Sequence, residues 1–307
     1  MILDSINQEL LTLKEKKYRS LPQLIHDGRD VTVDGRRMLN LSSNDYLGLA
    51  NEVSLREAFL KTITPETFLP TSSSSRLLTG NFTAYQELEQ QLATMFGAES
   101  ALLFNSGYQL RRLLEENHGM YEKMIIVTES IFSMDGDEAD LQALVRLKHD
   151  YSNLLLYVDE AHAFGARGEK GLGCAEEQNC INDIDFLVGT FGKAAASAGA
   201  YIVCRQTIRE YLINKMRTFI FTTALPPVNI QWTAWVLKHF VDFRSKREHL
   251  LQISRKLKEA LTEKGYNCPS VSHIVPMVVG ASEDTIRKAE ELQRKGFYAL
   301  PVRPPTV

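Results

Sequence analysis

The sequence predicts an α/β protein with a mostly parallel central sheet covered by helices on both faces, followed by a smaller C-terminal α/β domain. Two observations lead to this fold class. Short apolar segments alternate with helical segments between residues 101 and 203, which is the pattern of βαβ units. The apolar segments are continuous rather than alternating, as expected of strands that are buried on both faces. They are 101–104, 124–127, 154–158, 186–188 and 200–203.

Shorter elements precede this region. Apolar residues at helical spacing predict a helix over residues 3–17. Asp34-Gly35 is a turn signal between two apolar segments and predicts a β-hairpin. A second helix is expected from Thr83 to Phe96, because Gly97 readily adopts the conformation that ends a helix.

The C-terminal part of the chain begins where Pro226-Pro227 interrupts the large region. The sequence then predicts a long helical region at about 228–265, a strand at 273–279, a helix at 282–295 and a final strand at 297–302. We therefore expect three parts. They are an N-terminal helix and hairpin segment (1–45), a large domain (46–228) and a small C-terminal domain (229–307).

Composition excludes several classes of partner. With 24% charged residues and a formal net charge of -3, nothing predicts binding to nucleic acid or to an anionic membrane. The N-terminus places Asp4 where a signal peptide needs a basic region, so we expect a cytoplasmic enzyme. The cysteines show neither paired spacing nor a disulfide framework, which predicts buried thiols and no metal site. They are Cys174, Cys180, Cys204 and Cys268.

Lys193 is the most informative single residue. It lies between small residues, about thirty residues after a strand that ends in Asp159 and is followed by His162. A lone lysine among glycines and alanines is usually a solvated loop residue. An aldehyde cofactor, however, needs an amine to form an imine, a carboxylate to keep a ring nitrogen protonated, and room for a bulky ligand. This combination predicts a pyridoxal-phosphate site.

Each supporting residue also has an ordinary interpretation. Asp159 closes an apolar strand and could simply cap a helix, whereas in a cofactor site it pairs with the pyridinium nitrogen. His162 could reach the oxygen substituent of the same ring, or be an ordinary loop histidine. Gly107 and Tyr108 lie in a turn that offers backbone N–H groups to a phosphate, although such turns are common. Thr190 could donate to the same phosphate.

Other nucleotide and hydrolase motifs are absent from the sequence. Gly192-Lys193 is not a Walker loop, because Ala194 replaces the hydroxyl residue and the upstream glycine is missing. Gly171-Leu172-Gly173 lacks the third glycine of a dinucleotide fingerprint. No G-x-S-x-G nucleophile elbow is present.

Six segments, in the same order along the chain, resemble the α-oxoamine synthases. They are Asn44-Asp45-Tyr46-Leu47-Gly48, Ser75-Arg76-Leu77-Leu78-Thr79-Gly80-Asn81, Phe132-Ser133-Met134-Asp135-Gly136-Asp137, Asp159-Glu160-Ala161-His162, Gly189-Thr190-Phe191-Gly192-Lys193-Ala194 and Phe221-Thr222-Thr223-Ala224-Leu225-Pro226-Pro227. Because the matches span most of the chain, they weigh more than any single motif. The resemblance implies a fold-type-I pyridoxal-phosphate transferase of the aminotransferase class I/II fold, acting as a homodimer with shared active sites.

The resemblance also implies residue roles. Lys193 carries the cofactor through an imine, Asp159 pairs with the pyridine nitrogen, and His162 contacts the ring hydroxyl region. The remaining implied contacts are Ser133 at the ring hydroxyl; Gly107, Tyr108 and Thr190 at the phosphate; Thr222 and Thr223 at the neighbouring subunit's phosphate; and Asn44 and Arg19 toward substrate.

Within the family, the segments around Lys193 and Pro226 look most like the member that joins L-alanine to a pimeloyl thioester in biotin synthesis. The donor is pimeloyl-CoA or a pimeloyl carrier protein. Sister enzymes that use glycine, giving 2-amino-3-ketobutyrate or 5-aminolevulinate, are the alternative, and a serine-using enzyme fits less well. A non-catalytic relative that serves as an assembly subunit would not need Lys193, Asp159 and His162 together.

The chain departs from the family pattern at two places. After Gln109 the family continues for several dozen residues that include a histidine stacked on the cofactor ring, and His118 does not match that histidine. The family also continues past Val307 to an arginine that binds the substrate carboxylate. Because losing part of the central sheet should not be tolerated, we expect the protein to retain both segments and the cofactor to order them.

Overall fold

The computed structural model describes residues 5–8, 10–11, 21–104, 124–150 and 153–303. The chain forms two compact units. The first unit comprises Met1–Ser42 and Ile286–Pro301, and the second comprises Ser43–Thr285 and Val302–Val307. The three-part division predicted from the sequence stays a prediction.

The first unit contains a four-stranded sheet of order β1-β2-β3-β9. The strands are β1 (Ile25–Asp27), β2 (Asp30–Val33), β3 (Arg36–Asn40) and β9 (Phe297–Tyr298). Asp34 and Gly35, with φ values of 48° and 76°, connect β2 and β3, and this confirms the predicted hairpin turn. Val31, Met38 and Tyr298 form the core of this unit.

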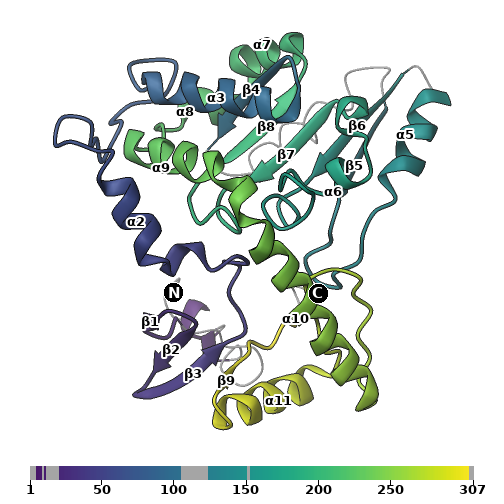
Figure 1. Cartoon of the computed structure of the whole chain (residues 1–307). Coiled ribbons are helices and arrows are strands. Elements are labelled where there is room, and N and C mark those ends of the chain that lie inside the picture. The colour runs from purple at the N-terminus through teal and green to yellow at the C-terminus, as the bar shows by residue number, and fades with distance from the viewer. Residues whose placement is uncertain (1–4, 9, 12–20, 105–123, 151–152, 304–307) are drawn as a thin grey trace. The chain divides into compact units, whose positions relative to one another are not determined.

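The second unit is built on a five-stranded sheet of order β4-β8-β7-β6-β5 (Figure 1). Its strands are β4 (Ser100–Phe104), β5 (Met124–Glu129), β6 (Leu154–Asp159), β7 (Phe186–Thr190) and β8 (Ala200–Cys204). The β5–β6 and β6–β7 pairs are parallel, and β8 runs antiparallel to both β7 and β4. Only β8 therefore opposes the common direction, which confirms the mostly parallel sheet.

Helices cover both faces of this sheet (Figure 1). Alternate side chains of each strand enter different apolar clusters, as the pleat requires. One cluster joins Leu103 and Tyr201 to α3 (Thr83–Phe96) and α9 (Pro227–Lys238). The other joins Leu102 and Ile202 to α7 (Gln206–Lys215) and α8 (Arg217–Phe221). The predicted helix at Thr83–Phe96 is confirmed, with Gly97 at φ 62°.

The remaining helices of the described chain are short or peripheral to this sheet. They are η1 (Leu49–Asn51), α2 (Val53–Leu60), α5 (Leu141–Asp150), α6 (Cys174–Glu177), η3 (Ile181–Asp183), η4 (Phe240–Phe243), α10 (Arg244–Glu263) and α11 (Ser282–Arg294). None of the helices in the described chain combines the length and the apolar character that a bilayer crossing requires. All four cysteines are free and buried, as predicted.

Three predicted elements are wrong in extent, and one of them is the final strand at 297–302, of which only β9 (Phe297–Tyr298) forms. The helical region at 228–265 is divided into α9, η4 and α10, because the 3₁₀ turn between them places Phe240 and Phe243 in the core. Residues 273–279 form no strand; only an isolated bridge joins Asn267 to Val278. Pro276 lies in this segment and cannot donate a ladder hydrogen bond.

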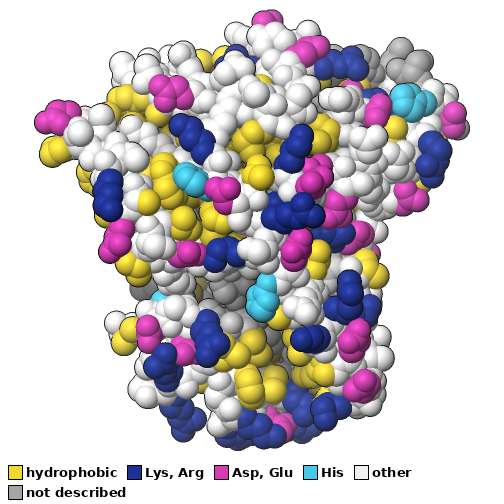
Figure 2. Space-filling model, in the orientation of Figure 1, with side chains coloured by type: hydrophobic (Ala, Val, Ile, Leu, Met, Phe, Trp, Pro, Cys, Tyr) yellow, Lys and Arg dark blue, Asp and Glu magenta, His cyan; other side chains and the backbone are white. Residues whose placement is uncertain are grey.

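Basic and acidic side chains are interspersed over the face drawn in Figure 2. This distribution agrees with the formal net charge of -3.

The candidate site residues predicted from the sequence gather at one edge of the five-stranded sheet. Glu129 and Asp159 pair across the C-terminal ends of β5 and β6, and β7 runs parallel to β6 beside them. The carboxyl end of parallel strands is where ligands bind in open α/β sheets.

Candidate active site

Lys193 lies in a tight loop between β7 and β8. The loop is closed by hydrogen bonds from the Phe191 amide to the Gly199 carbonyl and from the Ser197 amide to the Phe191 carbonyl, both 2.9 Å. Helix α9 holds it from outside, because Trp232 Nε1 donates to the Ala196 carbonyl at 2.9 Å. The lysine backbone is therefore fixed on both sides, which orients its side chain.

The small residues around Lys193 allow close packing of two loops. Gly165, in the loop after β6, has a φ of +81°, and a Cβ built there would stand 2.8 Å from the Ala194 Cβ. A larger residue at either position would push the loops apart. The small residues that made Lys193 look like a solvated loop residue are thus a packing requirement.

Replacing Gly165 with alanine is expected to lower the free energy of unfolding by about 3 kcal/mol, since backbone strain at positive φ adds to overpacking. Gly97→Ala is the matched control, because its φ of +62° carries the strain while nothing lies within 4 Å of the added Cβ. That control should lose only about 1 kcal/mol. Urea unfolding of both variants checks this, and equal losses would contradict the packing explanation.

The structure brings the predicted catalytic residues together. The distance from Lys193 Nζ to His162 Nε2 is 2.6 Å, and His162 Nδ1 lies 2.7 Å from the Tyr46 hydroxyl. The side chain of Asp159 accepts the Ala161 amide at 2.8 Å, which holds it at the end of β6. The charges of Asp159 and Glu129 both act on Lys193 and raise its pKa.

Burial sets the protonation of the two bases. It lowers the pKa of Lys193 to about 8, against the raising effect of Asp159 and Glu129. Burial also lowers the pKa of His162 to about 3, and the charges of Lys193 and His273 act in the same direction. At neutral pH His162 is therefore an uncharged imidazole, and a usable fraction of Lys193 is a neutral amine.

The reactivity of Lys193 should consequently rise with pH through a midpoint near 8. Only the neutral amine attacks an aldehyde, and ordinary lysines titrate near ~10.4. Reductive methylation of the cofactor-free protein at a series of pH values, with mass spectrometry of the Lys193 peptide, measures this midpoint. A midpoint near the ordinary lysine value would contradict the lowered pKa.

Other predicted site residues have the following positions. Thr190 donates its hydroxyl to the Gly199 carbonyl at 2.9 Å and accepts the Gly192 amide at 3.2 Å. Asn44 Oδ1 accepts the Tyr46 hydroxyl at 3.3 Å, which connects it to the His162 group. Ser133 lies half-buried after β5. Thr222 and Thr223 follow α8, and Thr223 forms a bridge with Ser75. Gly107, Tyr108 and Arg19 lie outside the described residues.

Two residues near the site were missed from the sequence. Tyr46 was noted only as part of a family motif, whereas its hydroxyl contacts His162. His273 was assigned to a strand, but it is 7% exposed and its ring packs edge-on against Tyr46, with centroids 4.4 Å apart. Among the described residues, neither ring nitrogen of His273 has a hydrogen-bond partner. No local sequence signal marks this buried histidine.

The donor set fits pyridoxal phosphate. Lys193 supplies an amine with a lowered pKa, Asp159 supplies a carboxylate at a strand end, and His162 supplies a neutral imidazole beside the amine. Gly192, the residue before the lysine, is exposed. A Cβ built on Gly192 would meet only Thr190 Oγ1 at 3.5 Å and the Ser197 carbonyl at 3.9 Å.

Comparison with known proteins gives the same assignment. The family model for aminotransferase class I and II matches residues 36–116 and 109–307. A Pasteurella multocida protein named "Putative 8-amino-7-oxononanoate synthase" is 47% identical over 349 residues, covering 98% of this chain and 90% of that protein. A Haemophilus influenzae protein of the same name is 46% identical, covering 99% of this chain and 93% of that protein.

Solved structures match the fold. Serine palmitoyltransferase from Sphingomonas wittichii superposes with a TM-score of 0.85 at 24% identity, covering 99% of this chain and 89% of that one. The 8-amino-7-oxononanoate synthase of Francisella tularensis gives a TM-score of 0.71 at 23% identity, covering 88% of this chain and 89% of that one. Fold and site together define a fold-type-I, pyridoxal-phosphate-dependent class of enzyme. The chain belongs to the aminotransferase class I and II family, and within it to the α-oxoamine synthases.

The relatives contain residues that this chain lacks. The alignment to the Pasteurella multocida protein has 349 positions against a chain of 307, so at least 42 positions have no counterpart here. The two family-model matches meet at residues 109–116, next to the predicted gap. The sequence runs directly from Gln109 to Leu110, so our expectation that this internal segment is retained is not met.

Proposed function

We propose that this chain is an 8-amino-7-oxononanoate synthase, which condenses L-alanine with a pimeloyl thioester and releases carbon dioxide. The observation that carries the proposal is 46–47% identity to relatives of that name over nearly the whole chain. The arrangement of Lys193, His162 and Asp159 supports it, because the reaction needs a base beside a site for an aldehyde cofactor.

The proposed mechanism assigns a task to each residue. Lys193 would hold pyridoxal phosphate through its aldehyde, Asp159 would face the ring nitrogen, and His162 would face the ring oxygen. When bound, the cofactor supplies an electron sink for the charge left on the alanine α-carbon. Lys193 Nζ, freed from the cofactor by alanine, accepts the α-proton as general base.

The α-carbon then forms a bond with the thioester carbonyl carbon, the carbon–sulfur bond breaks, and the thiolate leaves and takes a proton from solvent. Loss of the alanine carboxylate as carbon dioxide leaves a position that Lys193 Nζ reprotonates. The lowered pKa of Lys193, about 8, suits both transfers, since a proton carrier works best when its pKa lies near the working pH.

We further propose a homodimer with shared sites, in which Thr222 and Thr223 contact the phosphate of the neighbouring subunit. Phe221, beside them at the end of α8, is 76% exposed, and Leu78 is 78% exposed. The Ser75–Thr223 bridge brings the two segments that carry these residues together, and contiguous exposed apolar surface is typical of surfaces that a partner covers. A cytoplasmic location stays a prediction from the sequence.

A substrate comparison tests the proposal. Purified protein loaded with pyridoxal phosphate is given pimeloyl-CoA with alanine, glycine or serine, and release of the thiol is followed. We expect turnover with alanine, and a parallel run with a pimeloyl carrier protein decides between the two donors. Faster turnover with glycine would assign the chain to a sister synthase. No turnover with any amino acid on either donor would contradict the proposal.

A further inference from the structure

The group around Lys193 is a linear chain of hydrogen bonds. It runs from Lys193 Nζ to His162 Nε2 at 2.6 Å, from His162 Nδ1 to the Tyr46 hydroxyl at 2.7 Å, and from that hydroxyl to Asn44 Oδ1 at 3.3 Å. These residues come from three separate places in the sequence. Asn44 Oδ1, the acceptor at the end of this series of hydrogen bonds, fixes the donor and acceptor of each of the other bonds.

We propose that Tyr46 is a positioning residue that holds His162 as the Nδ1–H tautomer and so leaves Nε2 as an acceptor for Lys193. A side-chain amide oxygen can only accept, so the single hydroxyl hydrogen of Tyr46 goes to Asn44 Oδ1. The Tyr46 oxygen then accepts from His162 Nδ1–H. A neutral imidazole carries one N–H, and Nε2 therefore accepts an N–H of Lys193.

The protonation states of Tyr46 and His162 agree with this direction of the hydrogen bonds. Burial raises the pKa of the Tyr46 hydroxyl well above its ordinary value, so the hydroxyl keeps its proton. His162, with a pKa lowered to about 3, is neutral and has a defined tautomer. A charged imidazole would have two N–H groups and would turn one of them toward the Lys193 amine.

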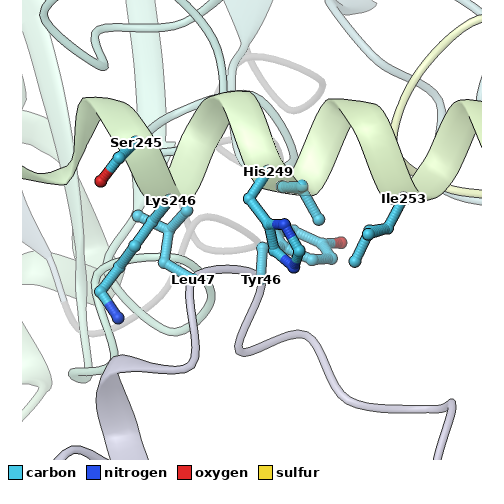
Figure 3. Close-up of a pocket in the computed structure, with 7 residues that line it drawn as sticks. Tyr46, Leu47, Ser245, Lys246, His249 and Ile253 are labelled. Carbon is cyan, nitrogen blue, oxygen red and sulfur yellow. The ribbon is translucent and has the colours of Figure 1, made fainter.

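The Tyr46 ring is itself held in place. It forms a T-shaped contact with the ring of His273, with centroids 4.4 Å apart. Tyr46 also lines a pocket of about 230 Å³ with His249, Leu250 and Ile253 of α10 (Figure 3). Asp45 fixes the loop, because its two carboxylate oxygens accept the amides of Leu49 at 3.0 Å and Ala50 at 3.1 Å.

Directing an N–H of Lys193 to His162 also directs the amine lone pair away from it. The lone pair of a neutral Lys193 then points into the rest of the site, because it does not accept a hydrogen bond from the imidazole. The importance of this orientation for catalysis rests on the proposed function. The tautomer of His162 does not depend on that function. Its test can therefore be made on the cofactor-free chain.

The test is the tautomer of His162, measured by long-range ¹H–¹⁵N NMR on protein labelled at histidine, with His162→Gln to assign the signal. Wild type is expected to be the Nδ1–H form. Tyr46→Phe removes the acceptor of Nδ1–H, so the Nε2–H form should become populated and the labelling midpoint of Lys193 should fall. Tyr85→Phe is the matched control, since its hydroxyl donates instead to the Leu225 carbonyl at 2.9 Å; it should change neither readout.

Asn44→Ala keeps the Tyr46 ring and tests the direction separately. Without its acceptor, the Tyr46 hydroxyl can donate to His162 Nδ1, and the Nε2–H form should again increase. Wild-type His162 in the Nε2–H form, or a tautomer ratio unchanged by both variants, would overturn the proposal. If the NMR result holds but alanine condensation is absent, the positioning role stands and the proposed function fails.

Discussion

Replacing Lys193 with alanine is expected to reduce acyl transfer by on the order of 10⁴-fold or more, because the residue serves as both covalent anchor and general base. The variant should also lose the visible absorbance of the cofactor-bound protein. Thiol release from pimeloyl-CoA in the presence of alanine measures the first effect, and an absorbance spectrum after cofactor loading measures the second.

Lys170→Ala is the control for this prediction. Lys170 is an exposed lysine in the loop that follows β6, so its removal should leave both readouts unchanged. A Lys193→Ala protein that keeps its absorbance and more than a few per cent of its activity would show that another residue carries the cofactor.

The second large effect is expected for Asp159→Asn, which keeps the side-chain shape and removes the charge. We expect activity to fall by about 10²- to 10⁴-fold, because an amide oxygen cannot stabilise a protonated ring nitrogen as a carboxylate does. The variant should also lower the labelling midpoint of Lys193 below about 8, since the Asp159 charge raises that pKa.

Glu129→Gln separates the effect of a lost negative charge on the pKa of Lys193 from the loss of a carboxylate at the ring nitrogen. Glu129 also raises the pKa of Lys193, so its loss should move the labelling midpoint in the same direction. It is not placed at the ring nitrogen, however, and its loss of activity should be much smaller. Equal losses of activity in the two variants would mean that Asp159 acts only through the charge it places near Lys193.

Local patterns in the sequence predict the parts of this structure that depend on local rules. Continuous apolar segments predict the five strands, but the predicted burial is wrong for β5, an edge strand in which Met124 and Val127 are exposed. Strands that run in the same direction place Asp159 and the residues after β7 at one sheet edge. The hairpin at Asp34-Gly35 and the helix end at Gly97 follow from the conformational freedom of glycine. The lysine and its carboxylate are therefore predictable from the amino-acid sequence alone.

Contacts between distant segments could not be predicted in this way. Tyr46 and His162 are 116 residues apart, and no periodicity relates them. His273 is buried and its ring packs against that of Tyr46, which is distant in the sequence, whereas its apolar neighbours suggested a strand. The break between α9 and α10 depends on burying Phe240 and Phe243, a tertiary effect that overrides helical spacing.

The claim that Lys193 is the cofactor lysine can be tested most directly by reductive trapping. The protein is incubated with pyridoxal phosphate, reduced with borohydride, digested and analysed by mass spectrometry. We predict that the added pyridoxyl mass is found on the peptide containing Lys193, in close to one copy per chain. Label on a different lysine, or no label at all, would contradict the assignment of this site.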